Sequence, residues 1–385
     1  MKEVLKTLVT WGIRCGLRIF WLFPIRRRQV FFSAYSGNQY ACNPKYISEA
    51  LAARYSQKLQ LIWCWKDTDF PDKPHGVRFV KFRSLRYFKE LLTSRVVVLN
   101  DLQHCSYLPF RKNQMLIQTW HGGGLYKKVG RDTPNNTVWN DRRLARTIKD
   151  TTLFLSSSTA FSDTVVRGAF GFDGEIREIG MPRNDILLNA DRAADAAKRV
   201  RSAYGFSENQ RLLLYAPTFR ENGTACPQTL DADRLLAACQ ARFGGDWKLL
   251  VRSHYLLAHS DLLCSPQCVD ATAYPDMQEL LCAADVLVSD YSSCIWDFSL
   301  TGKPCFIFAP DLDAYRFDRD FYMDIVDWPF PLAKTNDELD SYVRAFREKT
   351  YETQVLAHHH ALGNCESGHA AETIAKTIAD FCNSI

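Results

Sequence analysis

The sequence lacks the residue patterns of several common kinds of site. Its 13 cysteines include no CxxC pair, and Cys264 and Cys268 have no partner ligands at a zinc-site spacing. Because no cleavable secretory signal is present either, we expect reduced thiols in a cytosolic compartment. The chain also contains no G-x-x-x-x-G-K-[ST] loop and no strand-associated G-x-G-x-x-G. These absences count against P-loop nucleotide hydrolysis and dinucleotide redox chemistry.

Composition indicates an ordinary globular chain. Its 385 residues, 46% of them hydrophobic and 24% charged, are enough for two domains of typical size. The net charge of +5 is mild but unevenly placed, with clusters at Arg26–Arg28, Lys127–Lys128 and Arg142–Arg143. Such clusters predict anionic partners. We expect no nucleic acid among them, because the polar segments described below suit a small phosphate ester. The run His358–His360 is expected to be a solvated loop rather than a metal site.

The stretch from Val4 to Phe23 is apolar and aromatic, but it contains Lys6, Arg14 and Arg18 and leads into the arginine triplet. A membrane-spanning helix would have to bury those charges. An interfacial helix instead lets the cationic side chains reach lipid headgroups while the aromatic rings enter the acyl boundary. We therefore expect residues 1–28 to attach the protein peripherally to the anionic cytoplasmic face of the cell membrane. The alternative is a helix docked on the protein's own core.

Short β-like runs alternate with helical stretches along the whole chain. The predicted strands are Gln29–Ala34, Leu59–Trp65, Val96–Asn100, Met115–Thr119, Thr152–Ser156, Leu212–Ala216, Lys248–Arg252, Val286–Ser289 and Cys305–Ala309. This alternation predicts an α/β fold of two doubly wound, Rossmann-like domains. The clearest boundary lies in Asn189–Asn209, where a helix rich in alanine and arginine passes into a polar turn. We expect residues 29–195 and 196–385 to form the two domains, with the last helix packing back on the first. The carboxyl ends of both sheets then face one central cleft.

Residues 286–308 have the pattern of a strand, a polar turn, a short helix, a glycine stop and a second strand. The turn Asp290–Ser293 supplies N-cap chemistry, and Gly302 is a helix-ending signal. A helix that begins at Ser292–Ser293 directly after a strand points unpaired N–H groups and its positive dipole end at the crevice above the sheet. A phosphate or diphosphate fits there. The alternative is an ordinary strand-to-helix connection with a serine cap.

Further polar segments follow predicted strands and would face the same cleft. They are Gln118–Gly124, Tyr215–Arg220 and Arg252–Tyr255. His121 ends an apolar strand before a run of glycines, so it is either a general base beside a ligand or a histidine that caps its own sheet edge. His254 carries the same two interpretations, and Arg252 projects to the same side if the strand continues through both. The guanidinium of Arg220 would suit diphosphate oxygens or form a surface salt bridge.

In combination these segments resemble the CDP-glycerol glycerophosphotransferase family, which builds teichoic acids and related capsule polymers. The matching pieces are SGNQYACNPKYISEAL from Ser36, TWHGGGLYKKVG from Thr119, MPRND from Met181, LLYAPTFRENG from Leu213, VRSHYL from Val251 and SDYSSCIWDFSLTGKPCFIFAPDLDAY from Ser289. They occur in order across most of the chain. The resemblance implies a two-domain fold like that of GT-B glycosyltransferases. It also implies transfer of a polyol phosphate from a CDP-alcohol to an acceptor hydroxyl, with release of CMP.

The resemblance also implies roles for individual residues. His121 corresponds to the histidine of the family's WHG motif, a candidate base that takes the proton from the acceptor hydroxyl, and His254 falls on the second important histidine. Asp297 matches an acidic family position and is expected to orient a histidine or a donor hydroxyl. The residues expected to bind the substrate or its diphosphate are Gly122, Gly123, Thr218, Arg220, Arg252, Asp290, Ser292 and Ser293. Such a site works mainly by positioning and electrostatics.

Two departures from the family pattern bear on the acceptor. Gly123-Gly124 replaces the threonine-proline that often follows WHG, which predicts a looser loop. The chain also holds little besides the transferase unit and its apolar start, which looks like a primase that adds one or few units.

The expected donor is CDP-glycerol, or a near relative such as CDP-ribitol, and the expected acceptor is a lipid-linked or saccharide hydroxyl. The alternatives are a sugar-nucleotide glycosyltransferase of the same fold and a catalytically idle membrane-bound scaffold. No carboxylate cluster is obvious, and basic side chains can neutralise the diphosphate. We therefore expect no cofactor, and no obligatory protein-held Mg²⁺.

Overall fold

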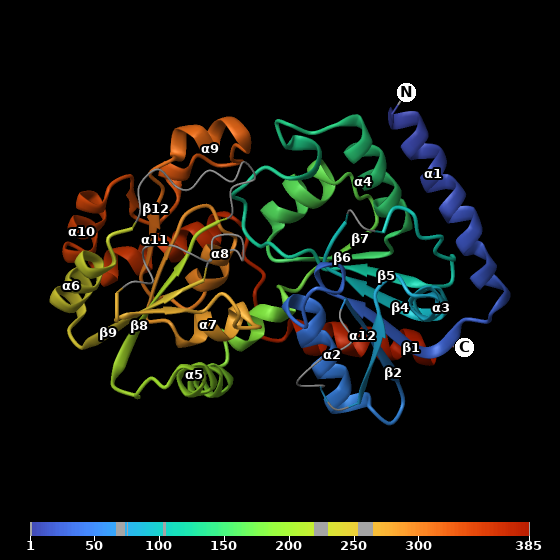
Figure 1. Cartoon of the computed structure of the whole chain (residues 1–385), viewed down its shortest axis with the longest axis horizontal. Coiled ribbons are helices and arrows are strands. Elements are labelled where there is room, and N and C mark those ends of the chain that lie inside the picture. The colour runs from blue at the N-terminus through green and yellow to red at the C-terminus, as the bar shows by residue number, and fades with distance from the viewer. Residues whose placement is uncertain are drawn as a thin grey trace.

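The structure is a computed structural model that describes residues 2–66, 74, 76–102, 105–218, 230–252 and 265–384. Two units lie side by side, each built on a parallel sheet with helices packed around it (Figure 1). The first unit holds the sheet formed between residues 26 and 178, and the second unit holds the sheet formed between residues 210 and 333. The predicted α/β fold of two doubly wound units is confirmed. Arg220 and His254 lie outside the described residues.

The first unit has a seven-stranded sheet in the order β3-β2-β1-β4-β5-β6-β7. Its strands are β1 (Arg26–Ser33), β2 (Gln60–Trp65), β3 (Val77–Lys81), β4 (Ser94–Leu99), β5 (Met115–Gln118), β6 (Leu153–Ser156) and β7 (Glu175–Glu178). All neighbouring strands are parallel. Phe31 and Phe32 of β1 point to opposite faces and join different apolar clusters, so both faces of the sheet are covered.

The second unit has a six-stranded parallel sheet in the order β10-β9-β8-β11-β12-β13. Its strands are β8 (Gln210–Ala216), β9 (Asp246–Val251), β10 (Cys268–Asp270), β11 (Val286–Ser289), β12 (Cys305–Phe308) and β13 (Leu332–Ala333). In each sheet the strand order reverses once, beside β1 in the first and beside β8 in the second. Ligands of open α/β sheets bind at such reversal points, outside the carboxyl ends of the strands.

Helices connect the strands and join the two units. They are α1 (Lys2–Leu17), α2 (Cys42–Tyr55), α3 (Leu85–Thr93), α4 (Val138–Asp150), α5 (Ala190–Tyr204), α6 (Ala232–Phe243), α7 (Met277–Ala283), α8 (Cys294–Ser299), α9 (Leu312–Asp318), α10 (Asn336–Arg344), α11 (Glu348–Ala361) and α12 (Ala370–Asn383), with a π-helical segment η4 (Phe161–Ala169). The last helix, α12, leaves the second unit and packs beside α2 on the first sheet. Helix α1 lies along the outer edge of the first unit (Figure 1).

The expectation for the histidine run is wrong. His358, His359 and His360 lie in the last turn of α11, and the first two are buried. The His358 Nε2 atom lies 3.2 Å from the Tyr126 hydroxyl, and the His359 Nε2 atom lies 2.7 Å from the Ser299 hydroxyl. Burial lowers the pKa of both rings from 6.5 to about 4. They are therefore neutral core residues behind α8, not a solvated loop.

Candidate active site

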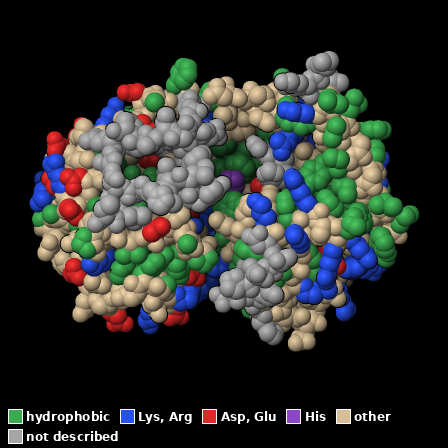
Figure 2. Space-filling model, in the orientation of Figure 1, with side chains coloured by type: hydrophobic (Ala, Val, Ile, Leu, Met, Phe, Trp, Pro, Cys, Tyr) green, Lys and Arg blue, Asp and Glu red, His purple; other side chains and the backbone are tan. Residues whose placement is uncertain are grey.

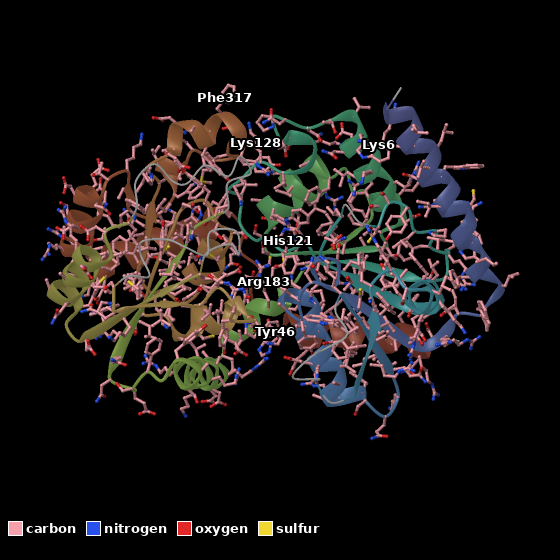
Figure 3. The ribbon with its side chains drawn as sticks, viewed as in Figure 1. Lys6, Tyr46, His121, Lys128, Arg183 and Phe317 are labelled. Atoms are coloured by element: carbon pink, nitrogen blue, oxygen red, sulfur yellow. The ribbon has the colours of Figure 1, made fainter. Side chains whose placement is uncertain are left out.

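His121 lies three residues beyond the end of β5, at the cleft between the units (Figure 3). Its Nδ1 atom lies 2.7 Å from the backbone carbonyl oxygen of Asn100. A carbonyl oxygen can only accept, so Nδ1 must carry the proton and Nε2 keeps its lone pair. Burial lowers the pKa of His121 from 6.5 to about 4, which leaves the ring neutral near pH 7. The imidazole is therefore fixed in the tautomer that a general base requires.

The backbone around His121 is strained and braced by the end of β4. Tyr35, Ser36 and Trp120 have φ values of 48°, 57° and 53°, in a region that costs energy for residues with a side chain. The Asn100 side-chain oxygen accepts the Tyr35 N–H at 2.8 Å, and an Asp101 carboxylate oxygen accepts the Ser36 N–H at 3.0 Å. Asn100 thus holds His121 through its backbone and Tyr35 through its side chain.

Asn100 and Asp101 were not among the predicted site residues. A signal was available, because two polar residues directly follow the buried run Val96–Leu99 at a strand end, the same pattern that pointed to His121.

The glycines after His121 pass between the two units. A Cβ atom on Gly123 would meet the Trp296 ring at 2.4 Å, and one on Gly124 would meet it at 2.9 Å. A Cβ on Gly122 would lie 3.6 Å from Ser293. The expected loosening of this loop is therefore wrong. The absent side chains let the loop backbone lie directly against α8 of the second unit.

Beyond the glycines, a strap spans the cleft. It consists of Tyr126–Asp132 from the first unit paired with Asp320–Tyr322 from the second. Lys127 and Phe321 form an antiparallel bridge, and the Lys128 ammonium lies 2.5 Å from Asp320. The ring of Tyr126 is buried in the apolar cluster of the second unit. The loop that carries His121 is thus anchored on both sides of the cleft.

On the second unit, Asp290 and Thr218 follow the adjacent strands β11 and β8. The Asp290 carboxylate accepts the Thr218 N–H at 2.9 Å, the Thr218 hydroxyl at 2.6 Å and the Tyr291 N–H at 2.5 Å. Asp290 is 2% exposed. It therefore braces the turn that presents Thr218 to the cleft, whereas we expected it to bind the diphosphate.

Helix α8 begins at Cys294, directly after the serine pair, as predicted, and Ser293 is its N-cap residue. The helix has only six residues, and Ser293 has helical dihedral angles and makes no side-chain cap. The Ser292 hydroxyl instead accepts the Cys294 N–H at 3.3 Å. The hydroxyl of Ser293 lines the cleft and has no hydrogen-bond partner within the described residues. A ligand in the cleft would therefore meet the Ser293 hydroxyl as a hydrogen-bond donor, more than the dipole of the short helix α8.

Arg252 follows β9 and is placed differently from the expectation. One of its guanidinium nitrogens donates to the Tyr274 carbonyl oxygen at 2.8 Å. Burial lowers its pKa. The residue is held by the second unit's own backbone and is not among those that line the cavity described below. Arg220 and His254, which would follow the ends of β8 and β9, fall in the segments outside the described residues.

Asp297 also has a different set of partners from the one expected. It is 2% exposed, and its oxygens accept from Arg183 at 2.9 Å, Asn184 at 3.0 Å and Gln278 at 2.9 Å. None of these described partners is a histidine. Arg183 and Asn184 belong to the MPRND segment before α5, so the carboxylate joins that segment to α7 and α8 of the second unit. Within the described chain, Asp297 is a positioning residue.

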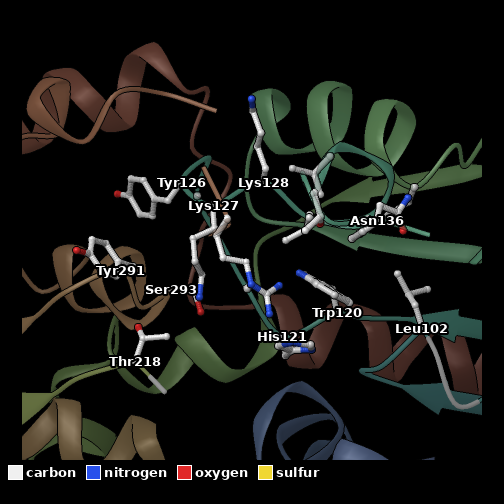
Figure 4. A pocket seen from close by; sticks show the side chains of 18 of the residues that line it. Leu102, Trp120, His121, Tyr126, Lys127, Lys128, Asn136, Thr218, Tyr291 and Ser293 are labelled. Atoms are coloured by element: carbon white, nitrogen blue, oxygen red, sulfur yellow. The ribbon is translucent and has the colours of Figure 1, made fainter. Parts of the chain in front are cut away.

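A cavity of about 660 Å³ lies between the units. Figure 2 shows a histidine at the bottom of this hollow, where Figure 3 labels His121. Figure 4 shows Thr218, Tyr291 and Ser293 on one wall, and Leu102, Trp120 and Asn136 on the other. Lys127, Lys128 and Arg319 also line it. Among the described residues, no group of histidine, cysteine and carboxylate side chains has the arrangement of a metal site.

Residues 16–380 match the family model of CDP-glycerol:poly(glycerophosphate) glycerophosphotransferase. A teichoic acid poly(glycerol phosphate) polymerase of Bacillus subtilis (strain 168) is 28% identical over 92% of this chain and 49% of its own length. The chain thus spans about half the length of that relative. A teichoic acid glycerol-phosphate transferase of Staphylococcus aureus is 26% identical over 98% of this chain and 99% of its own.

Solved structures of a teichoic acid polymerase also match this chain over nearly its whole length. A variant of the wall teichoic acid polymerase TagF superimposes with a TM-score of 0.85 at 26% identity, over 99% of this chain and 98% of the other. Another structure of TagF is of a variant soaked with CDPG. A ribitol-phosphate primase of Bacillus spizizenii is also 26% identical in sequence, over 94% of each chain.

Proposed function

The chain belongs to the CDP-glycerol:poly(glycerophosphate) glycerophosphotransferase family, and on that basis we propose that it transfers glycerol phosphate from CDP-glycerol to an acceptor hydroxyl and releases CMP. The observation that carries the proposal is the geometry of His121. Its Nδ1 proton is committed to the Asn100 carbonyl oxygen at 2.7 Å, its ring is neutral near pH 7, and it lines the cavity between the units.

The proposed reaction is a single displacement at phosphorus. His121 Nε2 takes the proton of the acceptor hydroxyl as its oxygen attacks the phosphorus bonded to glycerol. The new P–O bond forms while the bond from that phosphorus to the CMP oxygen breaks, and the electron pair leaves with CMP. Ser293 faces His121 across the cavity (Figure 4), so a diphosphate held by its hydroxyl would place the reacting phosphorus between the walls. Catalysis then depends on in-line positioning and on cationic groups near the leaving phosphate.

We also propose that α1 lies in the interface of an anionic membrane. Leu5, Leu8 and Trp11 are 63%, 59% and 63% exposed, whereas Arg14 points inward and lies 2.7 Å from Asp150 of α4. The helix thus keeps a cation against its own protein and turns large apolar side chains outward, the reverse of a helix docked on a core. Within the described residues, no helix is long and apolar enough to cross a membrane.

A ribitol donor is the second candidate, because a teichoic acid ribitol-phosphate primase matches this chain about as well as the teichoic acid glycerol-phosphate transferase does. The polyol has to be decided by experiment. Purified protein would be incubated with CDP-glycerol or CDP-ribitol and a lipid-linked disaccharide, and both CMP release and the mass added to the acceptor would be measured. CMP with an added glycerol phosphate supports the proposal. UDP released from a UDP-sugar control, with no CMP, would instead indicate a sugar-nucleotide glycosyltransferase.

Two further outcomes would refine the proposal. Loss of activity on chelation and its return with Mg²⁺ would refute the expectation that no protein-held metal is needed. Sedimentation with vesicles containing phosphatidylglycerol, but not with neutral vesicles, would support membrane attachment. Replacing Leu5 and Trp11 by serine should abolish this sedimentation and leave turnover of a soluble acceptor unchanged.

A further inference from the structure

The side chain of Gln118, the last residue of β5, lies between the ends of two neighbouring strands. It is fully buried, it is not among the residues that line the cavity, and the proposed reaction does not use it. Its Nε2 atom donates to the Asp101 carbonyl oxygen at 2.9 Å, and its Oε1 atom accepts the Trp120 N–H at 3.2 Å. A carbonyl oxygen only accepts and an N–H only donates, so these two partners fix the orientation of the amide.

This amide continues the hydrogen bonding of the sheet beyond the point where the paired backbones separate. The paired residues of β4 and β5 end at Leu99 and Gln118, and the next backbone bond joins the Thr119 N–H to the Leu99 carbonyl oxygen at 2.8 Å. At Trp120 the chain turns with a φ of 53°, a left-handed conformation that costs energy for a residue with a side chain. The Gln118 side chain thus supplies the contact that a longer strand would supply through its backbone.

Trp120 and Asp101 flank the hydrogen bond that fixes His121. Trp120 directly precedes His121, and Asp101 directly follows Asn100. The Asn100 carbonyl oxygen lies 2.7 Å from the His121 Nδ1 atom. The rings of Trp120 and His121 also pack on each other, with centroids 4.2 Å apart (Figure 4). The Gln118 amide therefore ties together the two residues next to the His121–Asn100 bond.

We infer that Gln118 is a positioning residue of the transfer, whose amide holds His121 in the orientation and tautomer that a general base requires. The inference rests on the proposed function, in which His121 Nε2 takes the proton of the acceptor hydroxyl. Without the amide, the Trp120 N–H loses its acceptor, and the left-handed conformation of Trp120 loses a bond that offsets its cost. The turn then relaxes, Nδ1–H leaves the Asn100 carbonyl oxygen, and both tautomers of the imidazole become populated. A ring with its proton on Nε2 cannot accept the acceptor's proton there.

The test has a matched control in Gln114, a second buried glutamine at the other end of β5. Its amide donates to the Ser94 carbonyl oxygen at 2.8 Å and accepts the Arg111 N–H at 2.9 Å, so it makes the same two kinds of backbone bond away from His121. Gln118→Ala and Gln114→Ala should therefore lower the melting temperature by similar amounts. Only Gln118→Ala should lower kcat, by about 10²-fold, while the KM for CDP-glycerol changes little in both variants.

Gln118→Glu separates positioning from stability. A protonated carboxyl group can replace the amide, because its C=O accepts the Trp120 N–H and its O–H donates to the Asp101 carbonyl oxygen. An ionised carboxylate has no donor, and burial raises the pKa of a carboxyl group. We expect the kcat of this variant to lie close to that of the unmodified chain at about pH 5 and to fall toward the Gln118→Ala value as the pH rises and the carboxyl ionises. The unmodified chain should show no such decline over the same range.

NMR of full chains with isotope-labelled histidine rings reads the tautomer without turnover. With the His121 signals assigned through His121→Gln, the unmodified chain and Gln114→Ala should carry the proton on Nδ1 alone, and Gln118→Ala should show both tautomers. An unchanged tautomer or kcat in Gln118→Ala would overturn the inference. An equal loss of kcat in Gln114→Ala, or a Gln118→Glu pH profile with the shape of the unmodified one, would overturn it too. If the unmodified chain releases no CMP in a folded sample, the proposed function fails, and the ring spectra still decide whether Gln118 sets the tautomer.

Discussion

Both walls of the cleft use a polar side chain directly after a buried strand as a brace, but they present different groups to the cleft. On the first unit, the side chains of Asn100 and Asp101 accept backbone N–H groups, and the Asn100 carbonyl oxygen accepts from one ring nitrogen of His121. The other ring nitrogen of His121 is left for the substrate. On the second unit, Asp290 is the brace, and the groups that face the cleft are the hydroxyl-bearing Thr218 and Ser293. The same sequence pattern therefore yields either a group that faces the cleft or its support.

The largest expected effect tests the reactive side of this comparison. His121→Gln keeps a polar side chain of similar size but removes the base, and we expect kcat to fall by about 10²- to 10⁴-fold. The KM for CDP-glycerol should change little, because the donor is expected to bind on the opposite wall. The exposed His360 gives a control, His360→Gln. Steady-state CMP release checks this prediction, and unchanged kcat would mean that His121 only caps its sheet edge.

The next effect concerns the connection between the walls. Asp297→Ala leaves the Arg183 guanidinium, which is 4% exposed, as an unpaired buried charge, so the free energy of unfolding should fall by about 3–5 kcal/mol. Urea unfolding followed by circular dichroism would measure it, with Asp313→Ala at an 88% exposed side chain as control. Full stability together with lost turnover would instead support the catalytic role first expected of Asp297.

A smaller effect is expected from Gly123→Ala. The new methyl group would meet the Trp296 ring at 2.4 Å, so the loop and α8 must separate, at a cost of about 1–3 kcal/mol in unfolding free energy. Turnover should fall as well, because the loop positions His121. Gly12→Ala, where no atom lies within 4 Å of the added Cβ, is the control. Equal melting temperatures for the two variants would show that the loop is as loose as the sequence suggested.

The smallest effect is the pH dependence of turnover and stability that the buried histidines cause. The pKa of His121 is lowered from 6.5 to about 4, so the base stays neutral and kcat/KM should hold down to about pH 5 and decline near pH 4. A lowered pKa in the folded state also means that stability is full above pH 6.5 and is lost as the pH falls toward 4. His358 and His359 add to this loss. An acidic limb centred at pH 6.5 would contradict the buried, neutral ring.

The strands show how far the sequence could predict the fold. Each predicted strand is present, and the ones that were not predicted are β3, β7, β10 and β13, the edge strands of both sheets. Central strands are buried on both faces and form continuous apolar runs such as VVVL in β4. An edge strand such as EIRE of β7 is half solvated, so its sequence carries no such signal.

The site shows the same limit. His121, Thr218 and Ser293 could be found because each follows a recognisable strand. Arg319 and Asn140 could not be found from the sequence. Arg319 follows the end of α9 and Asn140 belongs to α4, and only the tertiary structure brings these two helices to the cavity. The pairing of Asp297 with Arg183 was equally invisible, because the two residues lie 114 positions apart in the chain.

Helix α12 has a consequence for how the protein is made. Ile374 and Ile378 are fully buried in the same cluster as Val30 and Phe32 of β1, so part of the first unit's core is encoded after the whole sheet of the second unit. During synthesis this part of the core stays uncovered until α12 has been translated. A ribosome that stalls after the second unit therefore holds a first unit with an open apolar face, and chaperone crosslinking to stalled chains should end once the α12 codons have been read.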